Sequence, residues 1–199
     1  MGMVTTPVPT PFQDLDEFLA LPRASGLAVS PDGSRVVTSI AELNEKRTEF
    51  VSAIWELDPA GKQPARRLTR GVKGESSPEF TADGDLLFVA ARPTEDDDKP
   101  PASLWRLPAA GGEAVEELAL PGGIDAVRAA RAAAAIVVAA KLMRSAASAD
   151  QDKRLRTLRK DNKISAVVHS GYPVRYWDHD LGPDRPHLLD VGGPRDLTP

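Results

Sequence analysis

The residues best suited to chemistry in this sequence lie close together in its last quarter. Two imidazoles and three carboxylates follow one another as Asp178, His179, Asp180, Asp184 and His187. Imidazole nitrogens and carboxylate oxygens are common ligands of transition metals, so this cluster could in principle hold a metal ion. One glycine and two prolines interrupt it, which favours a hydrogen-bonded loop with a packed Trp177 nearby. We therefore expect no metal site and no other cofactor.

A catalytic nucleophile is equally hard to assign. Ser170, His169 and Asp178 are the residue types of a Ser-His-Asp site, but closeness in sequence does not indicate triad geometry. The sequence contains no cysteine and no Gly-x-Ser-x-Gly, the motif that places a serine on a strand-to-helix elbow. We therefore predict that these 199 residues carry no catalytic residue and are inactive alone.

Two charged runs have simple structural interpretations. The basic run 153–160 could contact nucleic acid or an anionic surface. Leu155 and Leu158 are three residues apart, however, so they would share a helix face that packs on the protein while the charges stay solvated. A domain or subunit contact is the next alternative. The acidic run 95–98 lacks the spaced oxygens and central glycine of an EF-hand loop, which predicts a solvated turn.

The composition is that of a globular protein without a polyanion-binding field. Hydrophobic residues make up 41%, and the net charge is -4. The apolar stretch 129–142 is interrupted by Arg131 and is shorter than the roughly 20 residues that span a bilayer. Residues 1–12 lack the basic start and apolar run of a secretory signal. We expect a cytoplasmic protein with no nucleic-acid or membrane partner.

A repeat of about fifty residues organises the elements that carry these side chains. Asp32-Gly33 and Asp83-Gly84 each stand between two apolar runs, which predicts two β-hairpins. A third strand follows in each unit, around Trp55 and Trp105. The Asp-Gly pairs are 51 residues apart and the tryptophans 50 apart, so two landmarks give nearly one period. We expect both tryptophans to pack between adjacent sheets rather than to line a ligand pocket.

Each unit closes with a fourth strand, at 65–69 and 114–118, and four short strands make one propeller blade. A third unit begins near Ile124, where an alanine run replaces the Asp-Gly turn. Alanine favours helix, but the period predicts a second strand at 136–138. Strands at 187–190 and 195–198 would close this unit. The interval 143–185 is then an insertion, with one helix expected over 149–162 and another over 163–170.

These patterns predict an all-β fold, a partial β-propeller of about three four-stranded antiparallel blades with a helical insertion in the third. The predicted units are an N-terminal segment with a short amphipathic helix, then three blades, at 1–22, 23–71, 72–123 and 124–199. The helix pattern rests on Phe12, Leu15, Phe18 and Leu19. Closed propellers usually have four to eight blades, so we expect further blades to complete the ring.

Three segments together resemble the N-terminal propeller of prolyl oligopeptidase family serine peptidases, including acylaminoacyl-peptidase-like members. They are Ser30-Pro31-Asp32-Gly33, residues 54–58, and residues 172–183 with their Arg-Tyr-Trp-Asp-His-Asp run. The resemblance implies that the segment gates or orients peptide substrates for an α/β-hydrolase domain outside this chain. That domain or the remaining blades, in cis or as a separate chain, would be its partners. The alternatives are a free-standing TolB-like or WD-repeat-like binding module and a truncated product without activity.

Overall fold

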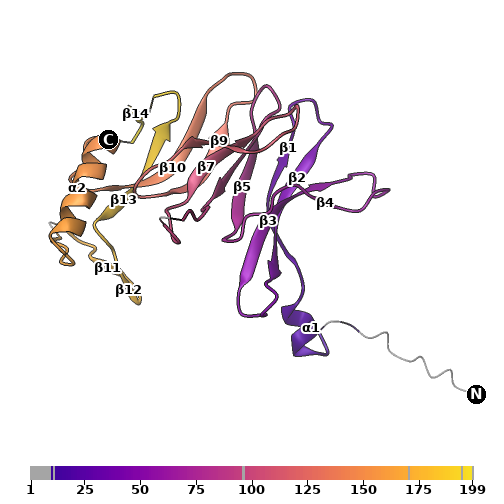
Figure 1. The fold of residues 1–199 in the computed structure, drawn as a ribbon, viewed down its shortest axis with the longest axis horizontal. Coiled ribbons are helices and arrows are strands. Elements are labelled where there is room, and N and C mark those ends of the chain that lie inside the picture. The colour runs from indigo at the N-terminus through magenta and orange to yellow at the C-terminus, as the bar shows by residue number, and fades with distance from the viewer. Residues whose placement is uncertain (1–9, 11, 96, 170, 194, 199) are drawn as a thin grey trace, which may run out of the picture.

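The computed structural model describes residues 10, 12–95, 97–169, 171–193 and 195–198. Three four-stranded antiparallel sheets follow one another along the chain and lie side by side, as Figure 1 shows. A short helix, α1 (Leu15–Leu19), precedes them; Asp14 caps it by accepting the Glu17 N–H at 2.9 Å. This helix buries none of its residues, and Leu15 is 71% exposed.

The first sheet holds its strands in chain order: β1 (Arg23–Val29), β2 (Val36–Leu43), β3 (Phe50–Leu57) and β4 (Arg66–Arg67). The predicted Asp-Gly hairpin joins β1 to β2. Gly33 takes a φ of +75°, a conformation that a side chain would strain. The Asp32 carboxylate fixes the turn by accepting the Ser30 hydroxyl at 2.6 Å and the Ser34 N–H at 3.0 Å.

The second sheet repeats this order with β5 (Glu75–Phe80), β6 (Leu86–Ala90), β7 (Ser103–Leu107) and β8 (Val115–Leu118). Its Asp-Gly turn is also present, and Gly84 has a φ of +86°. All residues of β6 are buried, because this strand has a neighbouring sheet on each face.

The third sheet consists of β9 (Ile124–Ala129), β10 (Ile136–Met143), β13 (Asp184–Asp190) and β14 (Arg195–Asp196). The alanine run forms the turn between β9 and β10, with the Ala130 N–H donating to the Ala135 carbonyl at 2.9 Å. The repeat period therefore gave the correct prediction here and helix propensity did not, because β10 is paired along both edges.

The insertion between β10 and β13 carries the expected helix, α2 (Ala149–Asp161), and a hairpin that was not predicted, β11 (Arg175–Tyr176) with β12 (His179–Asp180). The prediction of a second helix over 163–170 was wrong. Residues 163–169 are not helical, and Ser170 lies outside the described residues. Lys163 has a φ of +53°, and the Ile164 N–H donates to the Arg159 carbonyl at 2.8 Å, so the chain turns away as α2 ends.

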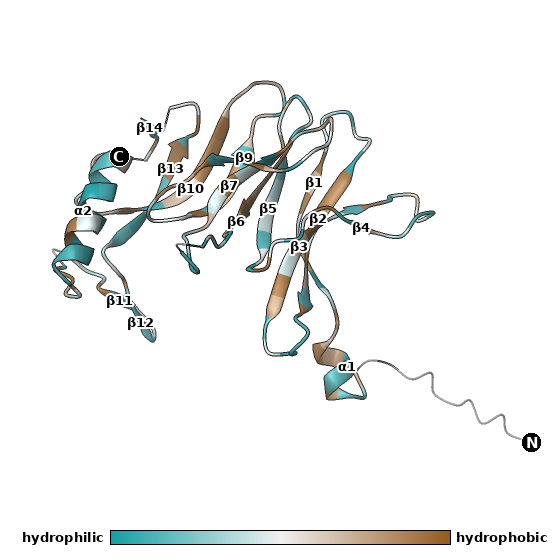
Figure 2. Cartoon of the chain, in the orientation of Figure 1, coloured by the Kyte–Doolittle hydropathy of each residue, from teal (hydrophilic) through white to brown (hydrophobic). Residues whose placement is uncertain are grey.

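Two apolar cores lie between the three sheets, and Figure 2 shows strands such as β2 and β10 largely in brown. Between the first and second sheets, Val37 and Ile54 meet Phe88. Between the second and third, Leu87 meets Val127. Successive residues of a strand point to opposite faces, so β6 supplies both cores. Together these sheets form a partial all-β propeller, as predicted. No helix in the described part of the chain is long and apolar enough to cross a membrane.

Candidate functional site

The hairpin β11–β12 exposes the first part of the predicted polar cluster. Asp178 Oδ1 lies 3.3 Å from Nδ1 of its neighbour His179, and Asp180 lies 3.6 Å from the Arg175 guanidinium. Trp177 occupies the turn with a φ of +49° and is 96% exposed. The expectation of a packed Trp177 was therefore wrong, because the hairpin turn holds this side chain in solvent.

The second part of the cluster, Asp184 and His187, forms hydrogen bonds with residues outside the cluster. Asp184 accepts a hydrogen bond from Arg156 at 2.9 Å, and His187 Nδ1 lies 2.7 Å from Asp196 Oδ2. Partial burial raises the pKa of Asp196, but hydrogen bonds from the Thr198 N–H and His187 outweigh this and leave the pKa below its usual value. Among the residues that the structure describes, no three His, Cys, Asp or Glu side chains are grouped to hold a metal ion.

The Ser-His-Asp alternative is not tested by the structure. Ser170 lies outside the described residues, and Asp178 has His179 beside it. His169 lines a cavity in the insertion. The absence of a catalytic residue stays a prediction.

The helix α2 is attached through charged residues. The Asp152 side chain is fully buried and accepts the Met143 N–H at 2.8 Å and Arg156 Nε at 2.7 Å. Arg156 Nη2 also donates hydrogen bonds to Asp184 Oδ1 at 2.9 Å and to the Lys141 carbonyl oxygen at 3.3 Å. Burial lowers the pKa of Arg156, and the two carboxylates raise it above its usual value.

The predicted packing of α2 through two leucines was therefore wrong in part. Leu155 is half-buried, but Leu158 is 56% exposed. The inward face of the helix begins instead at Asp152 and Arg156, which are one turn apart. The acidic run 95–98 behaves as predicted in its described residues, because Glu95, Asp97 and Asp98 are all exposed.

A cavity of about 300 Å³ lies in this insertion, between the end of β10, helix α2 and the segment that precedes the hairpin. Its wall combines basic, polar and apolar side chains. The lining residues are Met143, Arg144, Ser145, Arg159, Val167, Val168, His169 and Pro183.

The two repeated tryptophans have different surroundings. Trp105 packs against the core between the first and second sheets, as predicted, and its Nε1 donates to Ser103 Oγ at 2.9 Å. The Arg92 guanidinium lies 4.0 Å from the centre of its ring. Trp55 is half-buried, and its Nε1 has no hydrogen-bond partner among the described residues. Ile54 points to the second sheet, so Trp55 points away from it.

Trp55 belongs to an apolar surface that we call the outer face of the first sheet. Its apolar residues are Leu27, Val29, Val36, Trp55 and Leu57, and the strand register also places Thr38 and Arg67 on this face, on either side of Trp55. Leu27 is 68% and Val29 43% exposed, so this face has no covering layer in the described part of the chain. An uncovered apolar sheet face is a candidate interaction surface.

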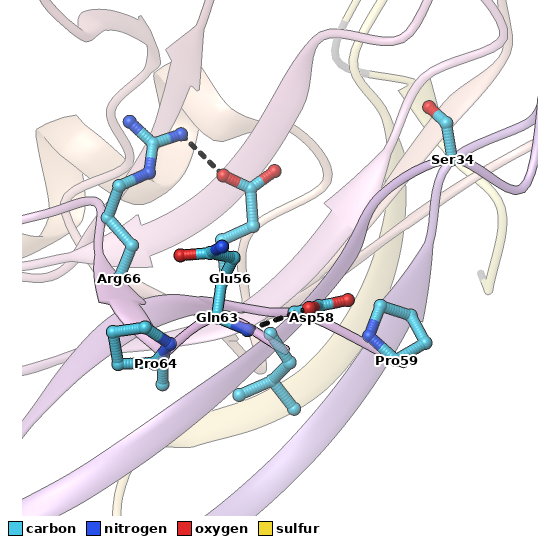
Figure 3. A pocket seen from close by; sticks show the side chains of 9 residues that line it. Ser34, Glu56, Asp58, Pro59, Gln63, Pro64 and Arg66 are labelled. Atoms are coloured by element: carbon cyan, nitrogen blue, oxygen red, sulfur yellow. Dashed lines mark hydrogen bonds and ion pairs between the residues drawn. The ribbon is translucent and has the colours of Figure 1, made fainter. Parts of the chain in front are cut away.

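The first sheet also borders a hollow of about 600 Å³, shown in Figure 3. Its carboxylates already have partners. Asp58 accepts three backbone N–H groups, from Ala60, Lys62 and Gln63, and those bonds lower its pKa. Glu56 bonds Arg66 within the hollow.

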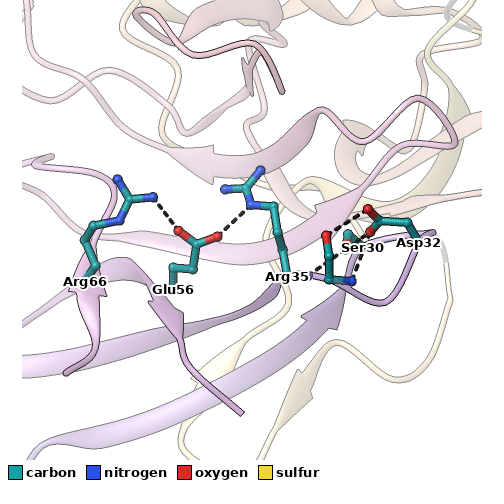
Figure 4. A network of polar contacts seen from close by, with 6 residues as sticks. Ser30, Asp32, Arg35, Glu56 and Arg66 are labelled. Atoms are coloured by element: carbon teal, nitrogen blue, oxygen red, sulfur yellow. Dashed lines mark hydrogen bonds and ion pairs between the residues drawn. The ribbon is translucent and has the colours of Figure 1, made fainter. Parts of the chain in front are cut away.

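Figure 4 shows how this network ties the strands of the first sheet together. Glu56 also accepts Arg35 Nε at 2.6 Å. Burial raises the pKa of Glu56, but the two arginines outweigh this and lower it. At the hairpin, the Ser30 hydroxyl and then Ser34 lower the pKa of Asp32 to about 2. Because the acidic groups have partners within the sheet, we assign the network a structural role.

Comparison with known proteins supports the fold. No protein-family model and no curated protein matches the sequence. The acylaminoacyl peptidase of Pyrococcus horikoshii is similar in structure, with a TM-score of 0.60 and 10% identity over 91% of this chain and 25% of that one. The AtxE2 isopeptidase gives a TM-score of 0.53 and 15% identity, over 98% of this chain and 33% of its own.

A putative TolB from Agrobacterium tumefaciens is also similar, with a TM-score of 0.52 and 16% identity over 88% of this chain and 49% of that one. The chain thus spans about a quarter of the acylaminoacyl peptidase and about half of the TolB. At these identities the likeness concerns the fold, and it agrees with the propeller predicted from the repeat.

Proposed function

We propose that this chain is a propeller segment of a prolyl oligopeptidase family serine peptidase, which gates or orients peptides for an α/β-hydrolase domain outside these residues. The observation that carries the proposal is the structural match. Nearly all of this chain matches an acylaminoacyl peptidase, yet it covers only 25% of that protein. The sequence resemblance of residues 30–33, 54–58 and 172–183 supports the same family.

The outer face of the first sheet supports the presence of a further blade. The second sheet covers the inner face of the first with Phe80 and Phe88, and Trp105 joins the same core. Trp55 occupies the corresponding place one repeat earlier, so a blade packed on the outer face would enclose it as the first sheet encloses Trp105. Burying a large apolar side chain contributes about 1.5–3 kcal/mol, so covering Leu27 and Trp55 would stabilise such contact.

The occupant that we propose for this face is another four-stranded blade with an apolar surface, from the same chain or from a partner. A cytoplasmic location and the absence of nucleic-acid and membrane partners remain part of the proposal. The lack of cysteine suits a reducing compartment.

The first test is to sequence the coding region downstream of Pro199. We expect further Asp-Gly hairpins and then Gly-x-Ser-x-Gly. If neither is found, the peptidase proposal fails in this form. A free-standing binding module, which the TolB likeness would suit, or a truncated product then becomes the better explanation.

The second test uses the longer protein and compares hydrolysis of a short fluorogenic peptide with hydrolysis of unfolded casein. We expect the short peptide to be cleaved and casein to be excluded. Trp55→Ala should loosen blade closure and increase casein cleavage relative to the peptide, whereas Arg154→Met, on the exposed side of α2, should not. Equal cleavage of both substrates by the unaltered protein would contradict gating. The 199-residue chain alone should not react with a serine-directed phosphonate.

A further inference from the structure

The cavity in the insertion places two arginines beside an apolar wall. Arg144, Arg159 and His169 line it, together with apolar side chains that include Met143 and Pro183. None of its described lining residues carries a carboxylate. Asp152 on α2 and Asp184 on β13 are already paired with Arg156. The basic groups of the cavity are therefore not neutralised from within the described part of the chain.

Arg144 provides the strongest indication of a missing partner. Its Nε is buried and has no hydrogen-bond acceptor among the described residues. A buried donor without a partner is unusual in folded proteins and is costly, so an acceptor from a ligand would relieve it. The backbone holds this residue in place, because the Arg144 N–H donates to the Pro183 carbonyl at 2.9 Å.

Arg159 is fixed on the other side of the cavity. Its Nη2 donates to the Ala166 carbonyl at 2.9 Å, which ties the end of α2 to the segment leading to His169. The Arg159 guanidinium is thus held by a backbone carbonyl, and Arg144 is anchored through its own backbone N–H. A preorganised charged site loses less conformational freedom when it binds a ligand.

We propose that this cavity binds the carboxylate of a small ligand with an apolar side chain, such as the carboxyl-terminal residue of a short peptide. A guanidinium matches the planar carboxylate and can donate two parallel hydrogen bonds to it. Met143 and Pro183 would contact the apolar side chain, which inorganic phosphate lacks. That the ligand is a peptide rests on the proposed function, whereas recognition of the carboxylate does not.

The test is isothermal titration calorimetry of the 199-residue chain with N-acetyl-leucine, its uncharged amide and inorganic phosphate. We expect the acid to bind at least about tenfold more tightly than the amide, since hydrogen bonds to charged groups are the stronger ones. Phosphate should bind more weakly than the acid. Arg144→Met should weaken binding of the acid at least about tenfold while leaving the melting temperature unchanged or higher, because an unpaired buried group is removed.

Arg159→Met provides a second variant should Arg144→Met fail to fold, and Arg154→Met is the matched control on the exposed side of α2. Equal affinity for acid and amide, phosphate bound as tightly as the acid, or no effect of either cavity variant would each overturn the proposal. If the acid binds as expected but no hydrolase follows downstream, the peptidase function fails and the carboxylate site stands.

Discussion

The substitution Arg156→Met should release α2 from the third sheet. In the native structure Asp152 is fully buried and accepts one hydrogen bond from Arg156, at 2.7 Å, and one from the Met143 N–H, at 2.8 Å. Methionine keeps most of the apolar volume of arginine but removes the charge. The Asp152 carboxylate then remains buried with a single hydrogen bond.

Breaking a buried ion pair by removing one partner costs about 3–5 kcal/mol. We expect the lower end, about 3 kcal/mol, because the Arg156 side chain is 24% exposed and water can approach its place. Since α2 belongs to an insertion, this loss should appear as local opening of the helix and not as unfolding of the sheets.

Hydrogen exchange measured by mass spectrometry separates these two effects. If the free energy of opening α2 falls by about 3 kcal/mol, amide hydrogens in 149–161 that exchange through local opening should exchange more than about a hundredfold faster. Exchange in β6 should stay unchanged. Arg154→Met, on the exposed side of α2, should alter neither region.

The double variant Asp152→Ala with Arg156→Met tests the reasoning most directly. It leaves no unpaired buried carboxylate, so its α2 should exchange more slowly than in Arg156→Met alone. An acceleration below about threefold in the single variant would refute the assigned role of this pair, as would equal or greater acceleration in the double variant.

Two further predictions concern the sheets and their turns. Gly122→Ala should destabilise the fold by about 1–3 kcal/mol in urea unfolding, because the added Cβ would overlap the Lys141 carbonyl oxygen. Gly193→Ala, where the added Cβ has open space, serves as the control, and equal effects of the two changes would contradict this reason. Folding lowers the pKa of Asp32 from 3.8 to about 2, chiefly through the hydrogen bond from the Ser30 hydroxyl. The ionised Asp32 carboxylate therefore stabilises the folded state fully above pH 3.8, and this contribution is lost as the pH falls through about 2. The urea midpoint should therefore decrease over that interval, and Asp32→Asn should flatten the decrease; an unchanged slope would refute the assignment.

The sheets could be predicted because their signals are local and repeated. An Asp-Gly pair specifies a tight turn wherever it occurs, and the period of about fifty residues placed the second strand at 136–138 despite the alanine run. The unit boundaries 1–22, 23–71, 72–123 and 124–199 stay a prediction. The prediction of a second helix failed because helix propensity over 163–169 does not reveal where the chain turns after α2.

The insertion was harder to predict because its contacts depend on the third sheet. Asp152 and Arg156 have the spacing of an ordinary surface ion pair, and the sequence does not show that the carboxylate will be buried against the Met143 N–H at the end of β10. Arg144 is similar, since a lone arginine after a strand gives no sign that it will line a cavity or that its Nε will be buried without a partner.

The first and third sheets differ in a way that bears on the blade proposed to cover the first sheet. The outer face of the first sheet is mainly apolar, with Arg67 beside Trp55. The third sheet exposes Arg128 and Lys141, which form ion pairs with Glu79 and Asp125 at 3.6 and 3.3 Å. If a second copy packed its third sheet on this outer face, those charges would be removed from water against apolar side chains, at considerable cost. A blade that is apolar on its facing surface, as the second sheet is toward the first, avoids that cost. A different blade therefore fits the covering proposed for the first sheet better than head-to-tail association of this chain does.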